Sequence, residues 1–505
     1  MPRGRWSLLS WVTAILLLLV ASSAGAGEGA TSSADPAQGA CAEEEEEEEG
    51  LRERLTERED KRRPARPWCT VLAGHPLTVS GEWNAALSGA RPRFLGEREE
   101  QPDRLLLESE LEVEAFYTLG RRLSFFTQLR LILEEDLLPD TPDEVSDLFV
   151  ERGEMWLYAG EIAGTPLSFD VGRLSFEDDR RWWWDEDLDA VRVAYETETA
   201  EIALAVAREL GPSRSDRPFV EPQHEQVLRV LGEASWDWHE NHALELFALY
   251  SDDHSSTPKP GELVPLDRED ESDARLTWIG GRAMGVFDLE RRGLVGYWLD
   301  AAWVWGDERL LDLEEFSPSR SEVSSVARTQ VRAWAFDAGA SWLLPLPWEP
   351  RLYAGYALGS GDGAAEEGGT DRSFRQTGVQ ANEAGFGGVE RFPSYGVLLD
   401  PELSNLGVLT LGAGISLFRS SSLDLVYHRY RLDEPSASLR DASLEVALDG
   451  RHRELGDAID LVLAVEEWER YEFHVGLAGF RAGRAFGADQ GTWSIGGFVD
   501  FAVSF

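Results

Sequence analysis

Cysteine and lysine are scarce in this chain of 505 residues. It contains two cysteines, Cys41 and Cys69, and both precede Leu77, where we expect the first strand. A disulfide-rich fold is therefore excluded, and two interpretations stay open: the pair forms a periplasmic disulfide, or both residues are unpaired in a flexible segment. Lys61 and Lys259 are the only lysines among 48 basic residues, and the formal net charge is −45. Such an excess of acidic residues argues against nucleic acid as a partner.

Long hydrophobic runs are absent after the N-terminus. The apolar run over residues 8–20 follows Arg3 and Arg5 and precedes small residues that continue to Ala26. This pattern is typical of a secretory signal peptide, so residues 1–26 are expected to be removed on entry into the periplasm. No later run has the length of a membrane-spanning helix, and any insertion into a bilayer must use strands.

Catalytic and metal-binding patterns are also missing. The eight histidines are scattered without the spacing of metal ligands. The glutamate-rich segments are better explained by strand faces turned towards water than by a catalytic pair of acid and base. We therefore expect no enzymatic activity, no resident metal and no cofactor.

Composition divides the remaining chain into two parts. Residues 27–76 are rich in Ala, Ser, Gly and charge, and they include seven consecutive glutamates at 43–49. Such a segment cannot bury enough apolar surface to fold alone, which predicts a disordered periplasmic extension. Residues 77–505 alternate apolar and polar positions over segments of roughly ten residues. For them we predict an all-β fold, a transmembrane antiparallel β-barrel of about eighteen strands in the bacterial outer membrane.

The C-terminal segment, residues 493–505, shows this alternation and ends on an aromatic residue. Ile495 and Val499 fall on its apolar face, and Ser494 and Asp500 on the opposite face, as expected for lipid outside and water inside. We expect it to pair with the first strand and close the barrel. The expected strands are 77–88, 104–117, 122–133, 154–160, 166–174, 187–196, 200–210, 226–237, 242–251, 275–288, 294–305, 329–343, 350–359, 405–417, 422–431, 458–468, 471–483 and 493–505.

The lengths of the connections alternate along the chain. Every second connection is short, and the long ones include residues 252–274, 306–328, 360–404 and 432–457. Bacterial outer-membrane barrels have short periplasmic turns and long external loops, so this alternation supports the topology.

Parity along each strand assigns side chains to lipid or lumen. Over residues 124–134, Leu129 and Leu131 are assigned to lipid, and Gln128 and Arg130 to the lumen. The same rule gives a charged, water-filled lumen in which arginines pair with carboxylates of neighbouring strands. Rings of arginine in a pore favour anions.

Five segments, in order along the chain, resemble the alginate export family of outer-membrane porins. They are GRLSFEDDRRWWWDEDLDAV (172–191), SFRQTGVQANEAGF (373–386), PELSNLGVLTLGAGISL (401–417), LDLVYHRYRLD (423–433) and LGDAIDLVLAV (455–465). The resemblance implies a monomeric barrel in outer-membrane lipid that conducts an anionic uronate polysaccharide to the cell exterior through an arginine-rich constriction. Periplasmic polysaccharide-secretion proteins are the further partners that it suggests. The motif matches on this pathway are Arg173, Asp185, Asp187, Arg375, Gln376, Asn382, Asn405 and His428, and parity alone adds Arg130.

Two features depart from the family pattern. Members can carry a long periplasmic loop between the last strands that plugs the pore, whereas residues 468–471 form a tight turn here, so gating requires another element or a partner. Residues 1–75 hold nine basic and thirteen acidic residues, and removing them leaves a net charge of −41, which a polyanion passes only where arginines cluster locally. We expect residues 360–404, which contain Arg375, to fold into the lumen.

Other functions of such a barrel stay open at this point. A general or substrate-specific porin would pass small solutes without block by polyuronate. A barrel used as an anchor or adhesin would have a lumen filled by ion pairs and no measurable conductance. An outer-membrane hydrolase is disfavoured because no catalytic set converges on one rim of the barrel.

Overall fold

The computed structural model describes residues 68–91, 94–95, 104–120, 122–138, 146–253, 255, 258–270, 272–317, 319–363, 369–386, 388–468 and 470–505. The expected signal peptide, the extension as far as residue 67, Cys41 and the glutamate run lie outside these ranges. Among the described residues, no helix combines the length and the apolar character that crossing a membrane requires.

The described chain is almost entirely strand, with five short 3-10 helices. The elements are β1 (Trp68–Leu72), β2 (His75–Arg91), β3 (Phe94–Leu95), β4 (Arg104–Thr118), β5 (Leu123–Asp136), β6 (Ser146–Ala159), η1 (Ile162–Gly164), β7 (Leu167–Glu177), β8 (Asp185–Glu196), β9 (Ala200–Ala207), η2 (Pro222–His224), β10 (Val227–His239), β11 (His242–Asp253), β12 (Leu263–Pro265), η3 (Leu266–Arg268), β13 (Ser272–Asp288), η4 (Glu290–Arg292), β14 (Leu294–Ser317), β15 (Arg320–Leu343), β16 (Arg351–Gly359), β17 (Thr370–Asp371), β18 (Glu383–Ala384), β19 (Phe392–Pro393), β20 (Leu406–Leu417), β21 (Ser421–Leu432), β22 (Glu445–Val446), β23 (Glu454–Trp468), β24 (Tyr471–Ala482), η5 (Arg484–Asp489) and β25 (Trp493–Ser504).

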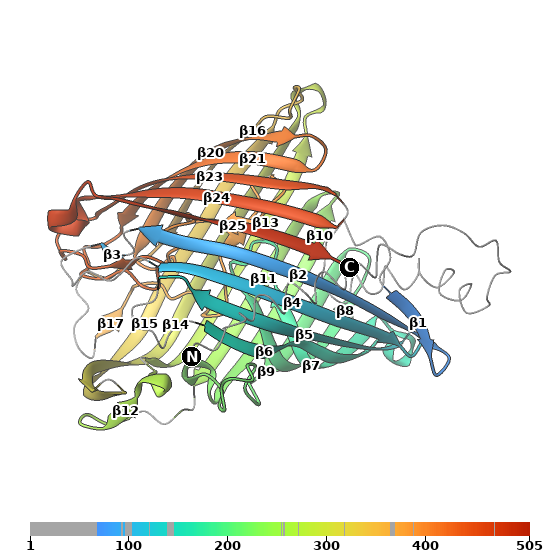
Figure 1. Cartoon of the computed structure of the whole chain (residues 1–505), viewed down its shortest axis with the longest axis horizontal. Helices are drawn as coiled ribbons and strands as arrows, with labels where there is room; N and C mark the ends of the chain where they lie inside the picture. Colours follow the sequence, from blue (N-terminus) through green and yellow to red (C-terminus); the bar gives the residue numbers. More distant parts are fainter. Residues whose placement is uncertain are drawn as a thin grey trace, which may run out of the picture. The chain divides into compact units, whose positions relative to one another are not determined.

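Eighteen of these strands form a closed antiparallel barrel, which confirms the predicted fold (Figure 1). Each wall strand pairs with the next along the chain, and β25 pairs with β2 from Glu82↔Ser504 to Arg91↔Ile495. Gly81 and Phe505 also exchange two backbone hydrogen bonds, of 3.0 and 2.9 Å. Closure pairs the first and last strands of the wall with each other, so the barrel has no edge strand.

The alternation of side chains follows the predicted parity. On β5 the lipid-assigned Leu129 and Leu131 are exposed on the outer surface, whereas Gln128 is buried inside the barrel. On β25, Ile495 and Val499 are exposed and Ser494 is buried. Because these segments have period two, each pairing register places one complete set of side chains against lipid.

Two expectations about the strands are wrong. Cys69 lies in β1, which pairs with the start of β2, so it does not precede the first strand. The expected loop at residues 306–328 is a continuation of β14 and β15, which stay paired as far as Ser317↔Arg320. Charged residues on both faces of this extension hide the alternation by which strands are recognised in sequence.

Candidate functional site

Two connections fold into the lumen between wall strands. The first, residues 178–184 between β7 and β8, is called the tryptophan loop below. The second, residues 360–405 between β16 and β20, is called the inner loop, and its described residues are 360–363, 369–386 and 388–405. Contacts of the inner loop with the tryptophan loop and with β13 confirm the expectation that this segment folds inward.

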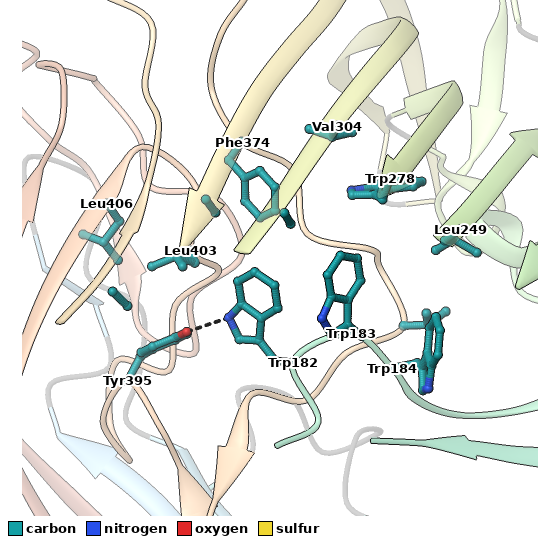
Figure 2. Packing of buried hydrophobic residues seen from close by; sticks show 14 of the residues in the cluster. Trp182, Trp183, Trp184, Leu249, Trp278, Val304, Phe374, Tyr395, Leu403 and Leu406 are labelled. Carbon is teal, nitrogen blue, oxygen red and sulfur yellow. Dashed lines mark hydrogen bonds between the residues drawn. The ribbon is translucent and has the colours of Figure 1, made fainter. Parts of the chain in front are cut away.

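The tryptophan loop packs its three indoles against the inner loop and the wall (Figure 2). Trp182 Nε1 donates a 2.8 Å hydrogen bond to the Tyr395 hydroxyl of the inner loop. Trp183 stacks on Phe247 of β11 with 5.0 Å between ring centroids and is 1% exposed. On the neighbouring strand β13, Trp278 donates to the carbonyl of Arg375 at 2.8 Å.

The expectation of a charged, watery lumen is therefore wrong for this layer. A large buried apolar cluster joins inward side chains of the wall to both loops. The wall strands alone do not reveal this cluster, because the indoles that complete it come from the tryptophan loop. An unbroken run of three tryptophans between Arg181 and Asp185 was the available signal, since tryptophans at the boundary of lipid and water are expected singly at strand ends.

The inner loop extends far along the lumen. Phe386 stacks on Tyr353, near the start of β16, with 4.5 Å between ring centroids. The backbone N–H of Val389 donates to Ser422 Oγ, near the start of β21, at 3.0 Å. Both contacts lie beside short turns, at the end of the barrel expected to be periplasmic. The inner loop therefore enters from the end with long loops and reaches the opposite mouth.

A buried charge network holds the tryptophan loop to the wall. Asp178 accepts hydrogen bonds from the backbone N–H groups of Trp183 and Trp184 at 2.7 and 3.0 Å. Its other oxygen lies 2.5 Å from Arg282 of β13, and that guanidinium also contacts Asp300 of β14 at 2.6 Å. Buried ions are retained only where each is paired and hydrogen-bonded, as here.

Arg130 and Asp187 meet in the lumen. Arg130 lies within 4 Å of four carboxylates, with N–O distances of 3.6 Å to Glu110, 3.3 Å to Glu112, 3.2 Å to Glu151 and 3.8 Å to Asp187. Its side chain is about one quarter exposed, at 27%. Arg130 is therefore a partly accessible cation surrounded by an excess of negative charge.

Two further arginines of the motif set are buried in ion pairs. Arg173 is buried on β7 and pairs with Glu209 at 2.8 Å. Arg375 pairs with Glu308 at 2.7 Å and Asp371 at 2.6 Å.

Asp185 lies beside the turn of the tryptophan loop, 3.5 Å from Arg181, and its N–H donates to the carbonyl of Val379 in the inner loop. It therefore joins the two inward loops.

The amides and the histidine of the motif set fix loops and strands. Gln376 and Asn382 exchange two amide hydrogen bonds of 2.8 and 3.0 Å inside the inner loop. Asn405 binds the backbone of Glu434 through both amide atoms, at 2.9 and 2.7 Å. His428 is fully buried, with Nδ1 3.0 Å from Thr410 and Nε2 3.4 Å from Asp460. Asn405 therefore holds backbone in place, the Gln376–Asn382 pair links two parts of the inner loop, and the fully buried His428 links β20, β21 and β23.

Arg229 of β10 is a lumen arginine that sequence reasoning missed. It is 5% exposed, and its Nε and Nη1 atoms have no hydrogen-bond partner among the described residues. Its Nη2 lies 3.2 Å from His224 Nδ1. Burial and then the positive charge of Arg229 lower the pKa of His224 to about 4, so the imidazole is neutral and accepts this bond. The available signal was its spacing of two residues from Val227 and Leu231, which are buried on the same face of β10, but no motif drew attention to it.

Comparisons with known proteins place the sequence of this chain in a family. The model of the alginate export family matches residues 77–498. The alginate production protein AlgE of Pseudomonas aeruginosa is 27% identical over 377 residues, which cover 71% of this chain and 75% of that protein. AlgE of Pseudomonas syringae pv. tomato is 22% identical over 336 residues, or 63% of this chain and 65% of that protein.

Among solved structures, the P. aeruginosa protein OccK5 (OpdH) aligns with a TM-score of 0.48 and 9% identity, covering 85% of this chain and 98% of that one. The family match spans nearly the whole barrel, including both inward loops. The chain therefore belongs to the alginate export family of bacterial outer-membrane barrels.

Proposed function

We propose that the barrel exports an anionic, alginate-like polysaccharide by passive diffusion, guided by arginines in the lumen. Family membership supports the substrate class. The observation that carries the mechanism is the contact set of Arg130, a partly exposed guanidinium held by four carboxylates. A sugar carboxylate is chemically equivalent to a glutamate side chain and can replace one of these partners without a new kind of bond.

Exchange of one carboxylate for another also explains how a polyanion passes a lumen with an excess of negative charge. Lumen arginines occupied by carboxylates are not strongly attractive to a polyanion, and each sugar is released as readily as it is bound. Conduction requires such weak binding at several sites. Arg173 and Arg229 provide a second position, since both act electrostatically on Glu186 and His224. A buried N–H without an acceptor costs about 1–3 kcal/mol, which an incoming carboxylate would offset at Arg229.

The inward loops must move before a polymer passes. The tryptophan loop and the inner loop pack against each other inside the wall, so the arrangement described here is a closed form. The inner loop takes the role of the periplasmic plug that the tight turn between β23 and β24 does not provide.

Substituting Arg130 and Arg229 by Ala together tests the proposal. In planar bilayers, the wild-type barrel is expected to prefer anions and to be blocked by polyuronate. The double variant should lose the anion preference, and its block should weaken by roughly tenfold or more, since a charged hydrogen bond contributes about 1.5–3 kcal/mol. Arg122→Ala, which removes an exposed arginine paired with Glu161 at a short turn, is the control and should behave as wild type. Unchanged selectivity and block in the double variant would contradict the proposal.

A second function, a barrel that serves as an anchor without conducting, is favoured by one observation. Paired charges and an apolar cluster fill much of the lumen. Absence of conductance in the wild type, even with polyuronate and an applied voltage, would support this function. Conductance of small solutes without any block would instead indicate a general diffusion porin.

A further inference from the structure

We propose that Glu390, Glu466 and His474 form a binding site for a divalent transition-metal ion, and that the ion ties the tip of the inner loop to the barrel wall. The site itself does not depend on the proposed function. The regulatory role of the site depends on the proposed function, because an inner loop bound to the wall keeps the lumen closed.

The three ligands come from two distinct parts of the molecule. Glu390 lies near the tip of the inner loop, whereas Glu466 and His474 point inward from β23 and β24. The loop tip is already held nearby, since the N–H of Val389 donates to Ser422 Oγ. The site is therefore at the mouth with short turns, where one bound ion would connect the loop to two wall strands.

The distances match those around a small ion. His474 Nε2 lies 3.2 Å from Glu390 Oε2 and 3.3 Å from Glu466 Oε1, and the three ligand atoms all lie within 4.8 Å of one another. Tetrahedral Zn²⁺ with bonds of about 2.0–2.2 Å separates its ligands by about 3.3–3.6 Å. Small adjustments of two glutamate side chains would suffice for binding.

The negative charge around His474 also favours the binding of a cation. Asp500 of β25 is its cross-strand neighbour, so three carboxylates face one imidazole. Asp500 accepts a 3.0 Å hydrogen bond from Asn84, which does not neutralise it. The arginine acting on Glu390 is Arg181, and its guanidinium is already held by Glu177, Asp185 and Glu383.

The ligand types define the class of ion. An imidazole nitrogen with two carboxylates suits Zn²⁺, Co²⁺, Fe²⁺ or Mn²⁺, whereas Ca²⁺ and Mg²⁺ prefer oxygen alone. Three protein ligands leave one position of a tetrahedral ion for water. The spacing 390, 466 and 474 shows no recognisable metal-binding pattern because the fold, not a local segment, assembles the site.

Metal binding is tested on the full-length barrel in detergent, without a histidine tag, after treatment with EDTA. Co²⁺ is the probe, because its visible absorption reports the ligands and their geometry. The wild type should bind one ion per barrel at this site. His474→Gln and Glu390→Gln should each weaken binding at least about tenfold, as a ligand contributes no less than its supporting shell. His452→Gln, which alters an exposed histidine paired with Asp449, is the matched control and should leave binding unchanged.

The role of the ion as a tie is tested by conductance. Adding EDTA to wild-type channels should raise the mean conductance, and Zn²⁺ should reverse the change. His474→Gln channels should be open more often and respond to neither. Failure to bind Co²⁺, or equal binding by wild type and both variants, would overturn the site. Binding of Co²⁺ without any response of conductance would overturn the tie, and neither result depends on whether polyuronate is transported.

Discussion

Excising residues 378–400 is expected to raise the single-channel conductance by roughly tenfold or more, since a barrel of 16–18 strands leaves an aqueous channel when nothing fills it. This excision removes the part of the inner loop that reaches the opposite mouth, including Phe386 and Tyr395. The ends lie close together because the N–H of Leu403 donates to Gln376 Oε1 at 2.7 Å. A short glycine–serine linker therefore joins them without strain on the wall.

The wall should survive this excision. Its hydrogen bonds run from strand to strand around a closed barrel, and residues 378–400 contribute no strand to that sheet. The lost stability is that of contacts inside the lumen, such as the stacking of Phe386 on Tyr353. Heat-modifiable migration on gels and circular dichroism would verify that the barrel is folded before conductance is measured.

A matched excision at the rim separates plugging from a general effect of shortening loops. Residues 258–270 contain β12 and η3, and β12 pairs with the outer part of β15, from Leu263↔Glu322 to Pro265↔Arg320. This segment is absent from the large lumen cluster, so removing it should leave the conductance near the wild-type value. Unchanged conductance after excision of 378–400 would mean that the inner loop is not the plug.

The barrel itself was predictable from the sequence. Every expected strand has a counterpart in the wall, because lipid on one side and the lumen on the other impose a period of two on pairs such as Gln128 and Leu129. The outer parts of β14 and β15 escaped this reasoning. They extend beyond the expected strand ends, and residues such as Asp307, Glu308 and Arg309 do not show one apolar face.

The contents of the lumen were less predictable. Motif resemblance marked Arg375, Gln376 and Asn382, but their partners are brought together by tertiary contacts that no local pattern encodes. The inward direction of residues 360–404 followed from their length, whereas the packing of Trp182 on Tyr395 did not. Loops inside a barrel follow neither the period of strands nor that of helices, so the contacts they make have no periodic signature in the sequence.

Arg282→Met is expected to destabilise the barrel by about 3–5 kcal/mol, because it removes the guanidinium shared by three carboxylates of a buried charge network and leaves Asp300 with Arg180 alone, at 3.3 Å. The Arg282 side chain is fully buried and contacts Asp178 at 2.5 Å, Asp300 at 2.6 Å and Glu245 at 3.3 Å. Met has a similar reach and keeps most of the packing against Phe247, so the loss is mainly electrostatic. Urea unfolding of the barrel in lipid vesicles, followed by tryptophan fluorescence, would measure the effect.

Position 275 on the same strand supplies the control. Arg275 pairs with Asp252 at 3.0 Å, but its side chain is 61% exposed. Exposed pairs contribute about 0–1 kcal/mol, so Arg275→Met should change the free energy of unfolding very little. A similarly small effect of Arg282→Met would show that water or rearranged carboxylates compensate for the lost guanidinium.

Adding Asp300→Asn to Arg282→Met extends the argument from stability to gating. If the cost of Arg282→Met is the unpaired charge, the double variant should recover part of it, since a neutral amide in place of the Asp300 carboxylate needs no cation. Asp178 would still lack Arg282, and Asp178 is the residue that binds the backbone of Trp183 and Trp184. We therefore expect a double variant that is more stable than Arg282→Met but whose tryptophan loop is less firmly held, with channel openings more frequent than in the wild type. Recovery of stability together with wild-type gating would show that Asp178 positions the tryptophan loop without Arg282.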